Sequence, residues 1–491
     1  MTGNKTGIIS KLYRHNLTLL TDLYQLTMAN GYWKNEMYHH EAVFHLFYRK
    51  NPFKNGFAIA AGLEQVINYL QNLHFDVDDI QYLANLKGFD GKVLFNEGFL
   101  NYLQRFEFNC DVDAVPEGTV VFPHQPLIRI KGNLIQAQIV ETALLTMVNF
   151  QTLIATKAAR IKAVASNDIV LEFGLRRAQG IDGGISASRA AYVGGCDATS
   201  NVLAGKLFDI PVKGTHAHSW VMCFDNELEA FSAYANSMPN NCTFLVDTYD
   251  TIEGVKYAIE IGKQLRLQGS DLVGIRLDSG DLATLSIEAR KILDDAGFEN
   301  SAIVASNDLD EYRIKTLKEN GSKITVWGVG TRLATAYDQP ALGGVYKLGA
   351  VKAPNETDWN YKIKLSEQAI KVSNPGILQV NRYFKNNLPI ADVIFNENAQ
   401  NNTDSLVTFN NETIDLTNYQ VKRLLRPIFR NGQLVYQLPT IHNIRNRSIA
   451  QIQQFDKKTL NEYKQGLEYN LHNRKMKMIE AVGNEQSAVF S

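Results

Sequence analysis

The sequence is poor in cysteine, proline and net charge, and each shortage excludes a class of protein. Its 491 residues include four cysteines and 12 prolines. Four cysteines without a CxxC pair are too few to cross-link this chain, which argues against a disulfide-built secreted scaffold and predicts reduced thiols in a cytoplasmic protein. The 50 basic and 51 acidic residues leave a net charge of −1, so a surface that binds polyanions over the whole molecule is not expected.

Long apolar runs are also missing. The opening residues MTGNKTGIIS lack the apolar segment of a signal peptide, and no run approaches the roughly 18 apolar residues of a membrane span. The basic stretch 422–477 contains interspersed acids, and we interpret it as a solvated surface rather than an RNA-binding one. We therefore expect a cytoplasmic globular protein without membrane or nucleic-acid partners. Its length exceeds that of one average domain.

The middle of the chain alternates short apolar runs with helical segments. The runs that we expect to be strands cover residues 168–173, 209–214, 242–247, 271–278, 301–306 and 323–328, with a weaker candidate at 195–200. Intervals of about 20 to 35 residues are typical of βα units in a parallel sheet. Seven consecutive units favour a closed α/β barrel, and an open doubly wound sheet is the alternative.

The sequence pattern before and after this alternating region is different. Residues 1–130 mix helical patterns with strand-like runs such as AVFHLFYRK, and the last part of the chain alternates short strands with Asn- and Lys-rich segments. We therefore predict an α/β protein with three parts. These are an N-terminal α/β domain (1–130), a TIM-like α/β barrel with the active site (131–350), and a C-terminal region (351–491) that returns to the N-terminal layer and extends it.

Polar residues follow the predicted strands at their carboxyl ends, where α/β barrels carry their active sites. They are Arg176 and Arg177 in GLRRAQG, Thr215, His216, His218 and Ser219 in KGTHAHSW, Asp247 and Asp250 in LVDTYD, Arg276, Asp278 and Asp281 in IRLDSGD, and Asn307 and Asp308 in SNDLDE. Each group has a structural alternative. Ser306 or Asn307 could cap the next helix, and so could the acids of RLDSGD.

The segment WGVGTRLAT contains a candidate phosphate-binding loop. Gly328 and Gly330 would let backbone amides approach an anion, and a helix beginning near Thr331 would add donors and a favourable dipole. A simple tight turn is the alternative. The place of the loop in the seventh unit favours the anion site, because barrels often bind phosphate there.

The two histidines of KGTHAHSW could bind a metal, move a proton or accept a phosphoryl group. An HxH pair can begin the zinc site of a hydrolase, but the next histidine after His218 is His442, far beyond the barrel units. Asp247 and Asp278 could instead hold Mg²⁺ beside substrate phosphates. Arginines, a glycine loop, magnesium-type acids and a nucleophilic histidine together predict chemistry on a phosphorylated sugar.

Six motifs resemble, in order, those of the nicotinate phosphoribosyltransferase family: LTDLYQLTMANGYW, EFGLRRAQG, GKLFDIPVKGTHAHSW, GIRLDSGDL, VWGVGT and ALGGVYKL. The resemblance implies an irregular α/β barrel packed against an N-terminal α/β domain, in a homodimer with a shared active site. It implies that nicotinate and phosphoribosyl pyrophosphate give nicotinate mononucleotide and pyrophosphate, with coupled ATP hydrolysis. Such an enzyme is of the ligase type and catalyses the first step of NAD salvage from nicotinate.

The same resemblance implies roles for individual residues. Tyr24, Thr215 and Arg276 would bind nicotinate. His218 would be the phosphorylated histidine, whereas His216 receives no chemical role. Thr331 with the preceding Gly328 and Gly330 would bind the 5-phosphate of the donor, and ATP would be a co-substrate. From the strand-end positions themselves we add Arg176, Arg177 and Asn307 as further substrate-binding residues, and Asp247 and Asp278 as catalytic residues and Mg²⁺ ligands.

Two other functions stay open. A nicotinamide-using relative would carry an aspartate that accepts the amide hydrogens, whereas the corresponding stretch ATSNVLAGK has Ser200 and Asn201, which disfavours the amide. A catalytically silent binding or regulatory protein on the same scaffold is the second. The filled reactive positions argue against it, and a turnover assay would decide.

Overall fold

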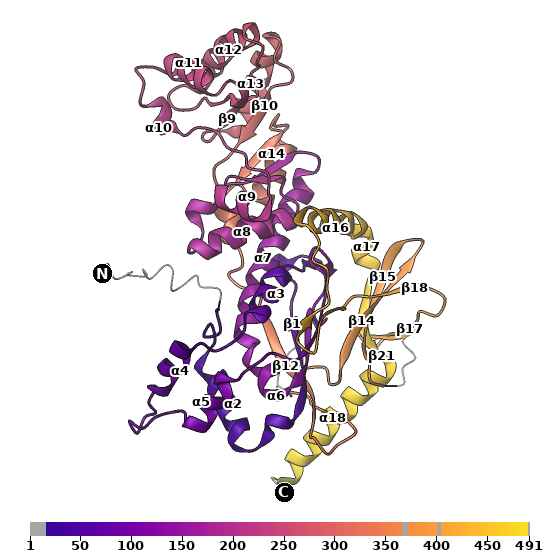
Figure 1. Ribbon diagram of the computed structural model, residues 1–491. Coiled ribbons are helices and arrows are strands. Elements are labelled where there is room, and N and C mark those ends of the chain that lie inside the picture. The colour runs from indigo at the N-terminus through magenta and orange to yellow at the C-terminus, as the bar shows by residue number, and fades with distance from the viewer. Residues whose placement is uncertain (1–15, 366–371, 400–403, 490–491) are drawn as a thin grey trace, which may run out of the picture. The chain divides into compact units, whose positions relative to one another are not determined.

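The computed structural model describes residues 16–365, 372–399 and 404–489 (Figure 1). The expected absence of a leader concerns residues 1–15 and lies outside the described residues. The chain forms two compact units. The first comprises residues 1–150, 341–439 and 453–491, and the second comprises residues 151–340 and 440–452.

The second unit is built on a parallel sheet of six short strands in the order β7-β6-β11-β10-β9-β8. The strands are β6 (Ile169–Glu172), β7 (Ala198–Thr199), β8 (Thr243–Leu245), β9 (Gly274–Leu277), β10 (Ala302–Ala305) and β11 (Val326–Val329). Every pairing between them is parallel. The α/β class predicted from the alternating pattern is confirmed.

These strands follow the chain order around an incomplete ring. Thr199 in β7 forms an isolated parallel bridge with Val212, and β11 pairs back with β6. Among the described residues, no ladder joins the Val212 segment to β8. The strand predicted at 209–214 is therefore reduced to one bridge, and backbone pairing does not close the expected barrel.

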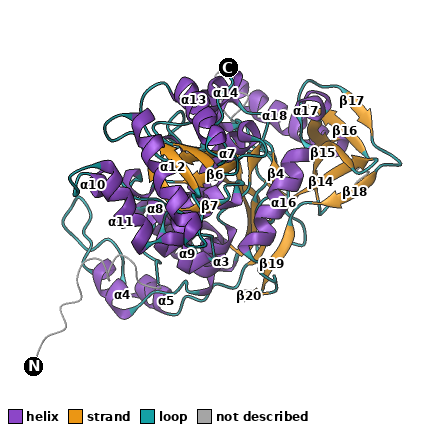
Figure 2. Cartoon of the chain, turned by 90° about the horizontal axis from the view of Figure 1, so that it is seen from above, coloured by secondary structure: helices purple, strands orange, loops and turns teal. Residues whose placement is uncertain are grey.

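The helices of this unit lie around the sheet (Figure 2), and those from α8 to α14 connect its strands. They are α8 (Ile181–Val193), α9 (Val202–Phe208), α10 (His218–Val221), α11 (Glu227–Ser237), α12 (Thr251–Leu267), α13 (Leu282–Asp295), α14 (Glu311–Glu319), α15 (Thr331–Ala334) and α16 (Ile441–Gln454). In α12, Val255, Ala258 and Ile259 are buried at the spacing of an apolar helix face. Gly254 lets this helix approach the sheet, because an added Cβ would lie 2.3 Å from the carbonyl oxygen of Val246.

The first unit contains two larger sheets and a two-stranded one. The first sheet has the order β13-β12-β1-β5-β3-β19-β20, the second β17-β16-β21-β15-β14-β18, and β2 pairs with β4. The strands are β1 (Glu41–Tyr48), β2 (Ala58–Ile59), β3 (Asp111–Ala114), β4 (Val120–Val121), β5 (Ile128–Asn133), β12 (Gly344–Lys352), β13 (Asn360–Tyr361), β14 (Leu378–Lys385), β15 (Leu388–Asn396), β16 (Ser405–Thr408), β17 (Thr413–Asp415), β18 (Gln420–Arg423), β19 (Arg426–Arg430), β20 (Gln433–Leu434) and β21 (Lys464–Glu468). Because β12 pairs with β1 and β19 with β3, late segments of the chain complete the N-terminal sheet.

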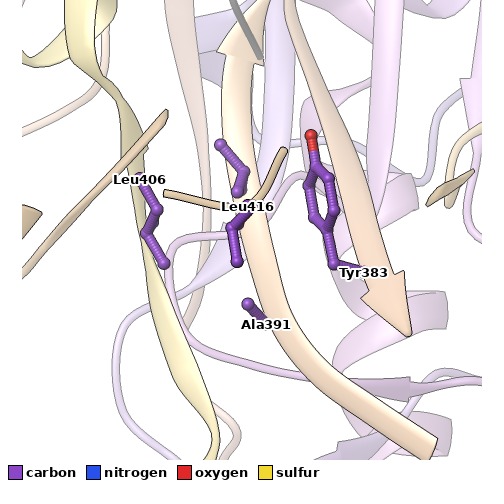
Figure 3. Close-up of a cluster of buried hydrophobic side chains, with 5 residues drawn as sticks. Tyr383, Ala391, Leu406 and Leu416 are labelled. Carbon is purple, nitrogen blue, oxygen red and sulfur yellow. The ribbon is translucent and has the colours of Figure 1, made fainter. Parts of the chain in front are cut away.

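The helices of the first unit are α2 (Leu23–Lys34), α3 (Leu63–Gln71), α4 (Val77–Ala84), α5 (Glu97–Gln104), α6 (Leu134–Ile139), α17 (Lys457–Glu462) and α18 (Tyr469–Val489). One cluster of its buried side chains includes Tyr383, Leu406 and Leu416 (Figure 3). Nearby in sequence, Arg382 is buried and paired with Asp392 at 2.8 Å. A charge inside a fold needs such a partner, because its desolvation is otherwise too costly.

One helical stretch, Leu134–Ala165, is long and apolar enough by length and composition to cross a membrane. It comprises α6 and α7 (Glu141–Ala165). Within the structure, 67% of its most apolar window is buried, as in the core helix of a globular fold. It is therefore weak evidence for a membrane span.

Candidate active site

Polar residues that follow the strands of the second unit meet at the carboxyl edge of its sheet. A pocket of about 350 Å³ lies there. It is lined by Phe173, Leu175, Arg176, Ser200, residues 214–218, Leu245, Arg276 and Asp278. Of the predicted site residues, the structure thus brings Arg176, Thr215, His218, Arg276 and Asp278 around one cavity.

The acids in the loops after the strands are of two kinds. Asp250, Asp281 and Asp310 cap the helices α12, α13 and α14, because each side chain accepts a backbone N–H of the first turn. Asp247 and Asp278 precede these caps in their loops and face the site instead. Since Asp310 caps α14, the alternative that Ser306 or Asn307 caps this helix is wrong.

Arg276 lines the pocket and makes three side-chain hydrogen bonds. Its Nε donates to Ser306 Oγ at 2.9 Å, its Nη1 to Thr215 Oγ1 at 3.1 Å, and its Nη2 to Asp278 Oδ1 at 3.2 Å. The ring centre of Phe173 lies 5.7 Å from the guanidinium carbon, within the range of a cation–π contact. The pocket therefore presents an oriented positive charge beside an aromatic ring.

His218 begins helix α10, and 39% of its side chain is exposed. Its Nδ1 lies 3.1 Å from Thr248 Oγ1. Its Nε2 lies 3.9 Å from Asp247 Oδ1 and 3.9 Å from Asp278 Oδ2. One ring nitrogen is thus held by a hydroxyl, and the other faces two carboxylates.

Asp247 is a buried carboxylate with one unsatisfied oxygen. Its Oδ2 accepts the backbone N–H of Asp278 and the hydroxyl of Ser279, both at 2.7 Å. Its Oδ1 is buried and has no hydrogen-bond partner among the described residues. A charged oxygen in this state is suited to a cation, such as a protonated imidazole or a metal ion.

A complete zinc site of the hydrolase type finds no support. In the described part of the chain, no group of three or more His, Cys, Asp or Glu side chains could hold a metal ion. The two aspartates beside His218 are fewer than such a site needs, although they suit an ion that takes its other ligands from water and substrate.

A further acid, Glu227 at the start of α11, lies close to this group and is buried. Burial raises its pKa to about 7, hydrogen bonds with Thr248 act in the opposite direction, and the charges of Asp247 and Asp250 add to the rise. Nothing in the sequence distinguished it from an ordinary acid in the first turn of a helix.

His216 bridges the gap in the sheet. Its Nε2 accepts the N–H of Leu245 in β8 at 3.3 Å, and its Nδ1 lies 3.4 Å from the carbonyl oxygen of Ala217. The ring packs against Tyr234 with centroids 4.9 Å apart, and burial lowers the pKa of His216 to about 4. It is therefore a neutral side chain that ties the edge strand β8 to the loop carrying His218.

Both glycines of the GVGT segment lie against Phe173. A Cβ on Gly328 would come within 2.7 Å of ring atom Cδ2 of Phe173, and one on Gly330 would lie 3.2 Å from its carbonyl oxygen. Thr331 begins the four-residue helix α15 and is partly buried. The glycines thus have a packing role, in addition to the anion-binding role that the sequence predicts.

The other predicted residues lie in different surroundings. Arg176 and Arg177 are exposed in the 3-10 turn η3 (Leu175–Arg177) that follows β6. Asn307 is exposed after β10, with a φ of 86°. Tyr24 belongs to α2 of the first unit, where it is 46% exposed, and its contribution to the site stays a prediction.

Sequence reasoning did not assign Phe173, Thr248 or Ser306 to the site. Phe173 directly follows β6, and Thr248 directly follows Asp247. A search of every residue that follows a strand, apolar ones included, would have found the first two. Ser306 was visible in the sequence, but helix capping offered an equally good explanation for it.

Comparisons with known proteins agree with one another. Models of the nicotinate phosphoribosyltransferase N-terminal domain, family and C-terminal domain match residues 19–149, 170–388 and 378–471. The chain is 43% identical over 447 residues to the nicotinate phosphoribosyltransferase of Bacillus subtilis, with 87% of each chain covered. It is 34% identical to that of Homo sapiens, over 88% of this chain and 90% of the human one. The crystal structure of human nicotinic acid phosphoribosyltransferase matches with a TM-score of 0.79 at 31% identity, over 93% of this chain and 99% of the other.

Proposed function

The chain belongs to the nicotinate phosphoribosyltransferase family, and we propose that it transfers the phosphoribosyl group of phosphoribosyl pyrophosphate to nicotinate. The products are nicotinate mononucleotide and pyrophosphate. We further propose that ATP hydrolysis is coupled to this transfer, as in a ligase-type enzyme. The reaction is then the first step of NAD salvage from nicotinate.

The observation that carries this proposal is the guanidinium of Arg276 beside the ring of Phe173. Nicotinate is a flat aromatic carboxylate, so its ring suits an aromatic face and its carboxylate suits a guanidinium fork. Thr215, whose hydroxyl is 3.1 Å from Nη1 of Arg276, would complete the nicotinate subsite.

The transfer itself needs no protein base. The lone pair of the nicotinate ring nitrogen attacks C1 of the ribose, the bond from C1 to the pyrophosphate oxygen breaks, and pyrophosphate leaves with the electron pair. The protein has to orient the two substrates and stabilise the charge of the leaving group. For the donor we propose Arg176, Arg177 and Asn307, with Gly328, Gly330 and Thr331 at its 5-phosphate.

His218 is proposed to accept the γ-phosphoryl group of ATP. If Nδ1 donates its proton to Thr248 Oγ1, 3.1 Å away, Nε2 carries the lone pair and is the nucleophile. It attacks the γ-phosphorus, the bond to ADP breaks, and ADP leaves with the electron pair. Water later hydrolyses the phosphohistidine and releases phosphate. The added negative charge would meanwhile act as a switch for donor binding.

Mg²⁺ fits the two acids beside His218. Asp247 has a buried oxygen without a partner among the described residues, and Asp278 Oδ2 lies 3.9 Å from the same imidazole nitrogen. Magnesium is usually held by one or two carboxylates, water and substrate phosphates, so these two aspartates are a sufficient protein contribution. When bound, the ion would supply positive charge that stabilises the leaving pyrophosphate.

We also propose a homodimer with shared active sites, in which Tyr24 of one subunit covers nicotinate in the other. In support, Tyr24 presents an aromatic ring that is 46% exposed. A cytoplasmic location is proposed because the cysteines are free thiols, as expected in a reducing compartment. No membrane or nucleic acid is part of the proposed function.

A nicotinamide-using transferase is the second candidate. Ser200 borders the pocket, and the side chain of its neighbour Asn201 caps α9. Neither residue offers a carboxylate to the hydrogens of an amide. Together with the charge of Arg276, this favours the acid over the amide as substrate.

The deciding experiment mixes the protein with nicotinate, phosphoribosyl pyrophosphate, ATP and Mg²⁺, and measures nicotinate mononucleotide. Parallel reactions with nicotinamide and without ATP report substrate choice and coupling. If no nicotinate mononucleotide forms under any of these conditions, the proposed function is wrong.

A further inference from the structure

Ser306 stands at the end of β10 with a hydroxyl that has two charged partners. Its Oγ accepts a hydrogen bond from Arg276 Nε at 2.9 Å and donates one to Asp278 Oδ1. A guanidinium can only donate and a carboxylate can only accept, so the direction of both bonds is determined. Since Arg276 Nη2 also donates to Asp278 Oδ1, the three side chains form a closed ring.

Among the described residues, no backbone group and no helix cap uses this hydroxyl. The backbone N–H of Ser306 already donates to the carbonyl of Leu277 at 3.0 Å, and Asp310 caps the next helix. The residue is 4% exposed, so contact with water does not explain why a polar side chain stands here. Asn307 then turns the chain away with a φ of 86°. The position of Oγ is thus set by the end of the strand, and its partners are both in the site.

The closed hydrogen-bonded ring of Arg276, Ser306 and Asp278 determines which N–H groups of Arg276 stay available. A guanidinium has five N–H groups, and the hydrogen bonds to Ser306, Thr215 and Asp278 use one each on Nε, Nη1 and Nη2. Each terminal nitrogen therefore keeps one N–H that is not used by the described residues. Two unused N–H groups on one guanidinium are the number that the two oxygens of a carboxylate can accept.

We propose that Ser306 is a positioning residue that holds Arg276 in the orientation in which its fork receives the carboxylate of nicotinate; this rests on the function proposed above. Without the hydroxyl, Nε would lose its acceptor and Asp278 Oδ1 one of its two donors. The guanidinium could then turn toward Asp278 and present a poorer fork. The effect should be specific to a ligand with a carboxylate.

The test compares Ser306→Ala with Ser306→Thr, which keeps a hydroxyl, and with Ser301→Ala as a matched control. Ser301 is a buried serine just before β10, and its hydroxyl donates to the carbonyl of Leu272 at 2.7 Å. For Ser306→Ala we expect the KM for nicotinate to rise about tenfold, with a smaller change in kcat and in the KM for the donor. Ser306→Thr should restore binding, and Ser301→Ala should leave the KM for nicotinate unchanged.

Nicotinate binding is also measured by calorimetry, so that the assignment is tested even if turnover is absent. A parent protein that binds nicotinate without forming product would contradict the proposed function alone. An active parent whose Ser306→Ala variant keeps the same nicotinate affinity would overturn the role of Ser306. Equal losses for nicotinate and nicotinamide would overturn it too. If the alanine variant does not fold, Ser306→Cys, of similar shape but with a weak donor, takes its place under the same criteria.

Discussion

Replacing Arg276 by alanine should weaken nicotinate binding far more than donor binding. The change removes the guanidinium that we propose as partner of the nicotinate carboxylate. A charge-assisted hydrogen bond contributes about 1.5–3 kcal/mol. At about 1.4 kcal/mol for each factor of ten, the KM for nicotinate should rise between about tenfold and about a hundredfold.

The structure also provides a graded control. Arg276→Lys keeps the positive charge, but an ammonium group cannot reproduce the planar fork that bonds Ser306, Thr215 and Asp278 together. We expect it to bind nicotinate more tightly than the alanine variant and less tightly than the parent. Nicotinamide, which lacks the carboxylate, should lose less affinity in both variants.

The assay measures initial rates against nicotinate concentration at saturating phosphoribosyl pyrophosphate and ATP. Arg276→Ala also removes the ion-pair partner of Asp278. A thermal melt of each variant therefore checks that the protein assayed is folded. If Arg276→Ala has the parent's KM for nicotinate, Arg276 is not the carboxylate partner, and the nicotinate subsite has to be sought elsewhere.

Three further predictions concern the histidines and the assembly. His218→Asn should lose ATP hydrolysis and most synthesis, whereas His216→Asn should keep ATP hydrolysis. Incubation with γ-labelled ATP should give an acid-labile, base-stable phosphoprotein. A label that survives acid would contradict a phosphohistidine. Sedimentation should show a dimer at assay concentration, and a fully active monomer would exclude a site shared through Tyr24. Because burial lowers the pKa of His216 to about 4, the unfolded chain binds more protons between that value and about 6.5. The contribution of His216 to the free energy of unfolding is therefore complete above about pH 6.5 and declines by up to about 3 kcal/mol toward pH 4. In His216→Leu, the free energy of unfolding measured with denaturant should therefore change less between these two pH values than in the parent.

Much of the second unit could be predicted from the order of its residues. Strand and helix periodicities are local, so β6, β8, β9 and β10 lie within the predicted runs, and β11 passes the end of its run by one residue. Parallel strands bring their carboxyl ends to one edge, and this rule alone places Thr215, Arg276 and Asp278 near one another. The strand predicted at 209–214 did not form, because strand pairing depends on a neighbouring strand, and the segment has only the bridge at Val212.

The sequence by itself therefore determined the α/β class, the family and the loops that carry the site, because these depend on local patterns and motif order. Only the tertiary structure decided what each side chain in those loops does. Asp278 and Asp281 are chemically alike, yet one joins Arg276 and the other caps a helix. The reason is that a side chain's role is set by its partners, and those of Arg276 come from Thr215, 61 residues away, and Ser306, 30 residues away. Contacts across such distances exist only after the sheet has formed.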